Sequence, residues 1–461
     1  MSRDSHTLEE IRARLFDLSE AQFAELVAYV ERAQASDAGR SFSAEALAAM
    51  RPRLRVARPQ RRPNAERIFC RPFEDLLHDL PAAGKRPGRI ARRAIRPAWA
   101  VLSRRLDGRL LAAVEREARR AGADAVDWAT QSWSSLWNAC GEAANALLAE
   151  ADGDSAARAD LRKKLGGADG LAELADMARM MTVAPHVEEL RHVLSPAPLT
   201  ALDEIQTAAV SAQFGALAAE KDTLWGPLAH AVIARMADPV ALAHAFGGSD
   251  CRDPGLHFLG SAAAGIAVAD IDATVAALGG LPAESAPAAL DVATHGEAVA
   301  DRIARLREGL RDRRFAGSFA EIDRVQRGLR TAVSQTVIAG ADAAVAGALG
   351  EAAGAARAAL RENAEARAHA LWKCSRFAGA IGMDREVVQA ARAVEDAAAR
   401  IALDRLKALE RAGADAAAGA IDAAADDLIH AVRVVELVAG SDKADLLRRR
   451  GFDVLDRLRA A

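Results

Sequence analysis

Two pairs of aspartates are spaced so that each pair could bind a metal ion. Asp75 and Asp79, and likewise Asp422 and Asp426, are four residues apart, which would place both carboxylates of a pair on one face of an α-helix. Such a pair can chelate Mg²⁺ bound to a diphosphate, as in isoprenoid-type enzymes of all-α fold. The spacing is permissive in a chain with 64 acidic residues and 4% aromatic residues. A Mg²⁺-diphosphate enzyme is therefore only a remote alternative.

Other motifs for metals, cofactors or covalent catalysis are weak. Glu189 and His192 form one E-x-x-H motif, whereas a di-iron helical bundle needs two, and the nearest substitute is Asp427 with His430. The sequence has no P-loop, no G-x-S-x-G elbow and no C-x-x-C pair. We expect no cofactor and no metal, and we favour a protein that is not an enzyme.

The strongest anomaly of the chain is a cluster of arginines near its start. Residues 51–120 contain 20 Lys and Arg against 7 Asp and Glu, a net charge of +13 in a chain whose total is −3. The arginines that we predict to contact phosphate or an acidic partner are Arg51, Arg53, Arg55, Arg58, Arg61, Arg62, Arg89, Arg92, Arg93 and Arg96.

This basic window allows three interpretations. Clustered arginines attract the phosphates of nucleic acid, and Phe69, Phe73, Trp99, Trp133 and Trp137 lie in or near the window. The arginines could instead be neutralised by acidic helices of the same chain or of another protein. Membrane-surface binding is the least favoured, because Pro97 interrupts the basic amphipathic stretch of residues 89–106.

Composition predicts an all-α fold. Alanine accounts for much of the 51% hydrophobic content and is the best helix former, while the β-branched residues that favour strands are sparse. Lysine is rare compared with arginine, which together with the alanine excess is typical of a GC-rich bacterial genome. Arginine abundance by itself therefore indicates little about phosphate binding.

Breaks in the helical pattern suggest five segments. We predict a helical hairpin, a basic Pro/Arg-rich linker, a first helical domain with a basic N-terminal segment, a Gly/Pro-rich connection and a C-terminal bundle of long helices. The two helical domains are expected to be irregular and bundle-like. The segments cover residues 1–34, 35–63, 64–246, 247–287 and 288–461, in that order.

The hairpin carries the residues that we predict to bind a protein partner. Capping boxes are expected where Thr7 precedes Glu10 and where Ser19 precedes Gln22. Two short helices bury little apolar surface alone, so the hairpin must dock on the rest of the chain or on a partner. The predicted docking side chains are Phe16, Phe23 and Tyr29.

Long antiparallel helices are expected near the end of the chain. Val387, Val394 and Ile401 recur at seven-residue spacing, and the helix that follows repeats the pattern with Leu428 and Val435. Alanines fill the intervening positions. The helices should therefore pack closely around a narrow seam.

The function that we predict is a cytoplasmic helical scaffold or adaptor that binds other proteins through its helical surfaces. Its four cysteines are far apart and its N-terminus has no signal-peptide pattern, which favours a reducing compartment. The apolar stretch from Phe258 to Ala269 is shorter than the ~20 residues of a membrane span. A nucleic-acid-associated protein is the alternative, and a homo-oligomer remains open.

Overall fold

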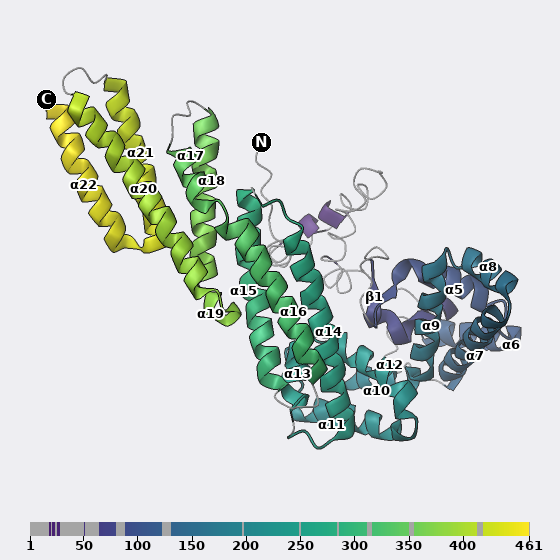
Figure 1. Cartoon of the computed structure of the whole chain (residues 1–461). Helices are drawn as coiled ribbons and strands as arrows, with labels where there is room; N and C mark the ends of the chain where they lie inside the picture. Colours follow the sequence, from purple (N-terminus) through teal and green to yellow (C-terminus); the bar gives the residue numbers. More distant parts are fainter. Residues whose placement is uncertain are drawn as a thin grey trace. The chain divides into compact units, whose positions relative to one another are not determined.

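The structure is a computed structural model of the chain, and within the residues that it describes the fold is helical. Two strands of two residues each are the exception, so the predicted all-α class is confirmed. The chain divides into two compact units, Met1–Ile266 and Ala267–Ala461 (Figure 1). The described residues are 18–19, 21–23, 25–27, 50, 64–79, 88–121, 131–195, 198–248, 250–283, 285–310, 316–349, 355–412 and 418–460.

The first unit is a set of mostly short helices. The segment at its start contains β1 and β2, which pair in parallel with Leu77 opposite Ile90. Its elements are α4 (Ala65–Cys70), η2 (Arg71–Leu76), β1 (Leu77–His78), β2 (Ile90–Ala91), η4 (Arg92–Ala94), α5 (Ile95–Leu102), α6 (Gly108–Ala121), α7 (Gln131–Gly153), α8 (Ser155–Lys164), α9 (Ala168–Thr182), α10 (Ala184–Val193), α11 (Glu204–Ala216), η5 (Ala218–Glu220), α12 (Lys221–Ile233), α13 (Val240–Phe246) and the beginning of α14 (Pro254–Gly279).

Polar side chains before several helices fix where those helices begin. Asn64 Oδ1 accepts a hydrogen bond from the backbone N–H of Arg67 at 2.9 Å, and this caps α4. Asp203 and Gln206 form a reciprocal capping box at the start of α11, with hydrogen bonds of 2.8 and 3.1 Å. These caps satisfy backbone N–H groups that have no partner inside the helix.

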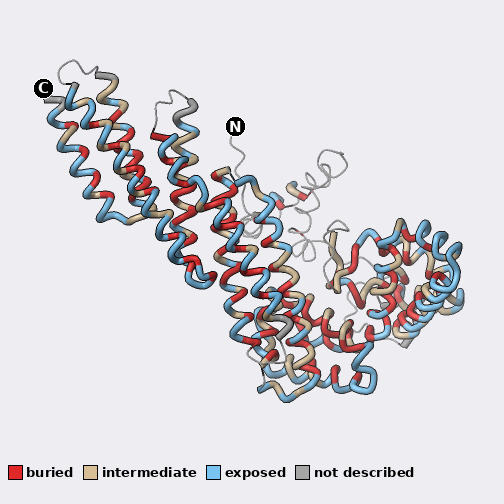
Figure 2. The backbone as a smooth tube through the Cα atoms, viewed as in Figure 1, coloured by how far each residue is buried: buried red, intermediate tan, exposed pale blue. Residues whose placement is uncertain are grey.

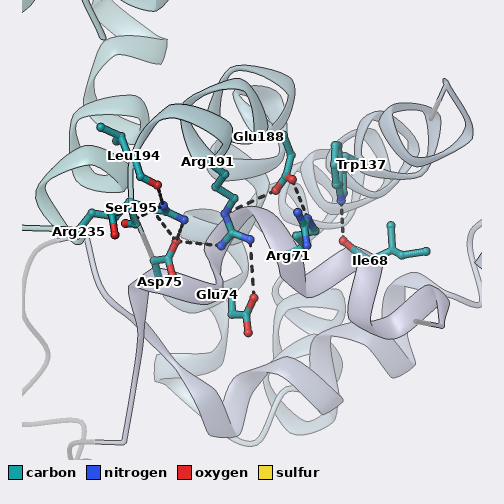
Figure 3. A network of polar contacts seen from close by, with 10 residues as sticks. All are labelled: Ile68, Arg71, Glu74, Asp75, Trp137, Glu188, Arg191, Leu194, Ser195 and Arg235. Atoms are coloured by element: carbon teal, nitrogen blue, oxygen red, sulfur yellow. Dashed lines mark hydrogen bonds and ion pairs between the residues drawn. The ribbon is translucent and has the colours of Figure 1, made fainter. Parts of the chain in front are cut away.

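Aromatic residues form much of the core of the first unit. Trp133 and Trp137, which are one turn apart in α7, are each 1% exposed, and Trp137 Nε1 donates a hydrogen bond to the carbonyl of Ile68 at 2.7 Å (Figure 3). Phe69 packs edge to face against Phe73 with ring centroids 5.2 Å apart. Both tryptophans therefore belong to the core of this unit.

Helix α14 occupies much of the stretch that we expected to connect two domains. Its 26 residues include Phe258 to Ala269 and extend past both of them, so the apolar helix is longer than the sequence pattern suggested. By length and apolar composition it could cross a membrane, and 39% of its most apolar window is buried. The core helix of a water-soluble protein meets the same criteria.

The second unit consists mainly of long helices that pack side by side (Figure 1). Buried and exposed positions alternate along each of them with a helical period (Figure 2). After the end of α14 its elements are α15 (Ala286–Gly309), α16 (Ala316–Ala332), the π-helical segment η7 (Val333–Ile338), α17 (Ala341–Ala348), α18 (Ala355–Ser375), α19 (Ala378–Ile381), α20 (Asp384–Ala412), α21 (Ala418–Ala439) and α22 (Ser441–Ala460).

Helices α20 and α21 are neighbours along the chain and pack against each other, as the heptad spacing indicated. In α20 the buried stripe starts at Val387 and Val394 and continues through Ala398 and Leu406, while Ile401 is only half-buried. A straight α-helix has 3.6 residues per turn, so a seven-residue spacing drifts away from the contact line over several turns.

A buried carboxylate joins three helices of the second unit. Asp427 in α21 is 1% exposed and forms ion pairs with Arg361 of α18, at 2.7 Å, and with Arg405 of α20. One helical turn later, His430 Nδ1 lies 3.1 Å from Glu365 Oε1 of α18. Burial lowers the pKa of His430, although the neighbouring Glu365 carboxylate acts in the opposite direction.

The predicted hairpin and linker lie mostly outside the described residues. In the hairpin, the box of Ser19 and Gln22 is present: the Ser19 N–H donates to Gln22 Oε1 at 3.0 Å, and the Gln22 N–H donates to Ser19 Oγ at 3.3 Å. In the linker range the described residue is Met50, which is helical and buried. The box of Thr7 and Glu10 falls outside the described part.

Candidate functional site

Most of the residues that we predicted to bind a partner are not described. Phe23 is, and with 2% of its surface exposed it is covered in this structure. The four described arginines of the predicted phosphate-binding set are Arg89, Arg92, Arg93 and Arg96. Outside the described residues lie Phe16, Tyr29, Arg51, Arg53, Arg55, Arg58, Arg61 and Arg62.

Two of the four described arginines contact acceptors on Asp75, which lies in η2, and on Asp79, which follows β1. Arg89 Nη1 donates a hydrogen bond to the backbone carbonyl of Asp75 at 3.0 Å. Arg92 Nε lies 3.4 Å from Asp79 Oδ1, with both side chains partly exposed. Arg89 thus contacts a neutral carbonyl and Arg92 a carboxylate, and both of these acceptors belong to the basic segment itself and not to an acidic helix elsewhere in the chain.

The other two are closer to solvent. Arg93 Nη2 lies 3.7 Å from Asp169 Oδ2, and both side chains are more than half exposed, so the pair contributes little stability. Arg96 is exposed and has no ion-pair or hydrogen-bond partner among the described residues. Of the predicted set that can be located, Arg96 is therefore the one most available to another molecule.

The Asp75 carboxylate is the centre of a polar network inside the unit (Figure 3). Its Oδ2 accepts a hydrogen bond from Arg191 Nη2 at 2.9 Å and two from Arg235, through Nη2 at 2.9 Å and Nε at 3.1 Å. Arg235 Nη1 also donates to the carbonyls of Leu194 and Ser195, at 2.7 and 3.3 Å. The network links η2 to the ends of α10 and α12.

A second buried carboxylate continues the network. Glu188 in α10 is 2% exposed, and its Oε2 accepts a hydrogen bond from Arg71 Nε at 2.6 Å. Its Oε1 lies 3.6 Å from Arg191 Nε, and Arg191 Nη1 lies 3.7 Å from Glu74 Oε2 (Figure 3). Buried charges persist in proteins when they are paired in this way.

Gly88, which precedes β2, lies close to the side chain of His230 in α12. Gly88 has φ +69°, and a Cβ atom there would lie 2.4 Å from Cγ of the His230 ring. Burial lowers the pKa of His230, although Asp176 acts in the opposite direction. Just beyond, the N–H of Ala91 donates to Oε2 of the buried Glu173 at 2.9 Å.

Of the two aspartate pairs, one shares a face of an α-helix as its spacing suggested, and the other does not. Asp75 lies in the 3-10 helix η2 and Asp79 follows strand β1, so the two do not share a face of an α-helix. Pro72 stands at the start of η2, and the short helix ends before Leu77. Asp422 and Asp426 do share the exposed face of α21, which belongs to the second unit.

The E-x-x-H motif is also placed without metal-binding neighbours. Glu189 and His192 are exposed on α10, and Asp427 is held by its two arginines. The described part of the chain has no group of three or more His, Cys, Asp or Glu arranged to hold a metal ion.

The apolar side chains of the basic amphipathic stretch point into the unit. Ile90, Ile95 and Leu102 are buried, and Trp99 and Val101 are half-buried. A membrane-binding helix needs those side chains on its outer face. Most of the apolar surface of this stretch is thus packed inside the unit.

Five exposed arginines remain in α5, α6 and the turn between them. None has an ion-pair or hydrogen-bond partner for its guanidinium among the described residues. They are Arg96, Arg104, Arg109, Arg116 and Arg119.

Helix α6 gathers three of these arginines on one side, which we call the α6 arginine face: Arg109, Arg116 and Arg119. Their spacing of seven and three residues keeps them within one side of the helix. The opposite side carries Val114 and Ala118, which are fully buried. The helix is therefore held by its apolar side and presents a row of cations to solvent.

Sequence reasoning found the basic window but did not single out the arginines of α6 that are exposed without a partner among the described residues. The arginines of the α6 arginine face lie inside residues 51–120, and the signal for them was present: basic residues spaced by three and seven opposite Val114 and Ala118. The partners of Asp75 carried no comparable signal, because Arg191 and Arg235 are more than a hundred residues away in the sequence.

The geometry of the first unit thus offers a cationic helix face rather than a catalytic cluster, and comparisons with known proteins add no homologue to guide its interpretation. No protein-family model, no curated protein and no solved structure matches the chain.

Proposed function

We propose that this chain is a non-enzymatic helical adaptor that binds an acidic surface of another protein on the α6 arginine face. The observation that carries the proposal is the set of three exposed guanidinium groups, at Arg109, Arg116 and Arg119, without counter-ions among the described residues. Arginine matches a carboxylate with two parallel hydrogen bonds, so a row of arginines complements a row of Asp and Glu side chains.

The packing of α6 fixes the spacing of its arginines along the surface. Val114 and Ala118 are buried, and Glu115 Oε1 accepts a hydrogen bond from the backbone N–H of Ala65 at 3.0 Å. The backbone of the helix is thus held on α4 and α7, while its three arginine side chains reach into solvent. Fixed, complementary charges increase the rate and the specificity of protein association.

Nucleic acid is the second candidate, because the same arginines could contact phosphates. Binding of single strands usually adds stacking of bases on exposed aromatic rings. Phe69, Phe73, Trp133 and Trp137 are buried in this unit and offer no such platform, while Trp99 is half-buried and has only part of its surface accessible. A duplex, which is bound through its backbone without stacking, remains the relevant competitor.

The proposed location is the cytoplasm. The four cysteines are free, and burial raises the pKa of Cys140 and of Cys374 to about 12. Scattered thiols without disulfide partners fit a reducing compartment.

The test uses two labelled probes with the full-length chain: a poly-glutamate peptide and a 20-base-pair DNA duplex. The test variant is Arg109→Gln/Arg116→Gln/Arg119→Gln. The control variant is Arg158→Gln/Arg179→Gln/Arg305→Gln, which removes the same charge from arginines that already have ion-pair partners. Fluorescence anisotropy at low salt measures both affinities.

The proposal predicts that poly-glutamate binds the wild type and the control equally, and the test variant about tenfold more weakly. Tighter binding of the duplex, with a steep dependence of affinity on salt and a loss in the test variant, would favour the nucleic-acid function instead. Equal peptide binding by all three proteins, or no binding of either probe, would refute a role for this face.

A further inference from the structure

A solvent-open cavity in the second unit is lined by arginines, and the proposed function does not use it. It has a volume of about 540 Å³ and lies between the end of α15 and the middle and C-terminal turns of α16. Its lining residues are Arg307, Ala320, Asp323, Gln326, Arg327 and Arg330. The volume is within the range of small-molecule sites.

The charges of the lining are unbalanced. Three guanidinium groups face a single carboxylate, that of Asp323, which leaves an excess of two positive charges. Asp323 is already paired with Arg307. Arg327 is exposed and has no partner among the described residues, and it stands one helical turn from Arg330.

Hydrogen bonds hold two of the arginines in place. Arg307 Nη2 donates to Gln326 Oε1 at 2.6 Å, while Gln326 Nε2 donates to the carbonyl of Ala380 at 3.0 Å. Gln326 is itself 9% exposed, so this bridge is sheltered from water. Arg330 donates through Nε to the carbonyl of Ile381, which leaves its terminal nitrogens available.

The backbone next to α19 makes room for Arg330. Gly382 has φ +69°, and a Cβ atom at this position would lie 2.6 Å from Arg330 Nη2. A side chain there would push the guanidinium away from the cavity. The glycine therefore allows Arg330 to lie at this edge of the cavity.

We propose that this cavity binds a phosphate dianion, either free phosphate or the phosphate group of a small metabolite, between Arg327 and Arg330. A dianion balances the excess of two charges, and tetrahedral oxygens accept the paired N–H groups of guanidinium. Bound phosphate also relieves the repulsion between two like charges one turn apart. Gln326 and Arg307 are hydrogen-bonded to each other and hold this part of the cavity wall in place.

The experiment is calorimetric titration of the full-length chain with inorganic phosphate and, separately, with glycerol phosphate, at constant ionic strength set with chloride. The variant Arg327→Gln removes the unpaired arginine. The control Arg324→Gln lies on the same helix, but Arg324 pairs with Asp272 at 3.2 Å and does not line the cavity. Circular dichroism checks that both variants keep the wild-type helix content.

We expect phosphate binding by the wild type and by Arg324→Gln, and at least a roughly tenfold loss in Arg327→Gln, since a charge-assisted hydrogen bond is removed. Tighter binding of the ester would identify an organic phosphate as the ligand class, tighter binding of inorganic phosphate would identify free phosphate, and equal binding would show that the site recognises the phosphate group alone. The proposal is overturned if the wild type binds neither probe, or if Arg327→Gln binds as well as Arg324→Gln does.

Discussion

Arg235 holds the carboxylate of Asp75 through two nitrogens, Nη2 at 2.9 Å and Nε at 3.1 Å from Oδ2. The two residues are 160 positions apart in the sequence. Both side chains are largely buried, with 11% and 15% of their surface exposed. This contact fixes η2, and with it the start of the basic segment, against the helices that follow.

Replacing Arg235 should therefore destabilise the first unit. In Arg235→Leu, Asp75 loses two hydrogen bonds and the carbonyl of Leu194 loses its donor, so we expect the free energy of unfolding to fall by about 3 kcal/mol. Urea denaturation followed by tryptophan fluorescence measures this, because five of the six tryptophans lie in the first unit. Arg179→Leu, which breaks an exposed pair with Asp176, should cost less than about 1 kcal/mol. Equal losses in both variants would contradict the structural role of the buried network.

In the second unit, adjacent aspartates of α21 offer a matched comparison. Asp427 is 1% exposed and pairs with Arg361 and Arg405, whereas Asp426 is exposed. We expect Asp427→Asn to cost about 3 kcal/mol, because the buried carboxylate is lost as the counter-charge of two partly exposed guanidinium groups, and Asp426→Asn to cost less than about 0.5 kcal/mol. Hydrogen exchange of peptides from α20 and α21 reports on this unit. Faster exchange in both variants, or in neither, would disagree with the burial of Asp427.

Gly88 should tolerate no side chain. Its φ of +69° disfavours other residues, and a Cβ atom would collide with the His230 ring at 2.4 Å. Gly88→Ala is therefore expected to lower the free energy of unfolding by about 3 kcal/mol. Gly166→Ala, where φ is +82° but the surrounding space is open, should cost only about 1 kcal/mol. Equal free energies of unfolding for the two variants would show that the contact with His230 does not destabilise Gly88→Ala.

The half-buried His230 should make the first unit less stable in mild acid. Burial lowers its pKa below the ordinary 6.5, so the unfolded chain takes up a proton that the folded chain does not. By linkage, the free energy of unfolding decreases as the pH falls below 6.5, and this contribution is fully retained above that pH. Urea denaturation from pH 8 to 5 should show a weaker pH dependence for His230→Gln than for the wild type. If the free energy of unfolding of the two proteins changed in parallel with pH, the result would contradict a lowered pKa of His230.

Local patterns predicted the elements that depend on neighbouring residues. The Ser19 and Gln22 box and the core position of Trp133 and Trp137 follow from spacings of three and four residues, which the helix itself imposes. The seam of α20 was only partly predicted, since Ile401 is half-buried where a strict seven-residue repeat would bury it. The full length of α14 was not predicted. Polar residues flank its most apolar stretch, and a helix can contain such residues, so the apolar pattern alone did not mark the ends of the helix.

By itself, the sequence determined that this chain is helical, because alanine-rich segments with apolar residues at helical spacing have few competing structures. It also located the basic window, since charge is a sum over residue types. Only the tertiary structure decided which arginines are available to a partner. Arg89 and Arg92 contact acceptors in their own segment, whereas Arg109, Arg116 and Arg119 face solvent. The physical reason is that an ion pair depends on distances between groups far apart in the chain, and composition contains no such distances.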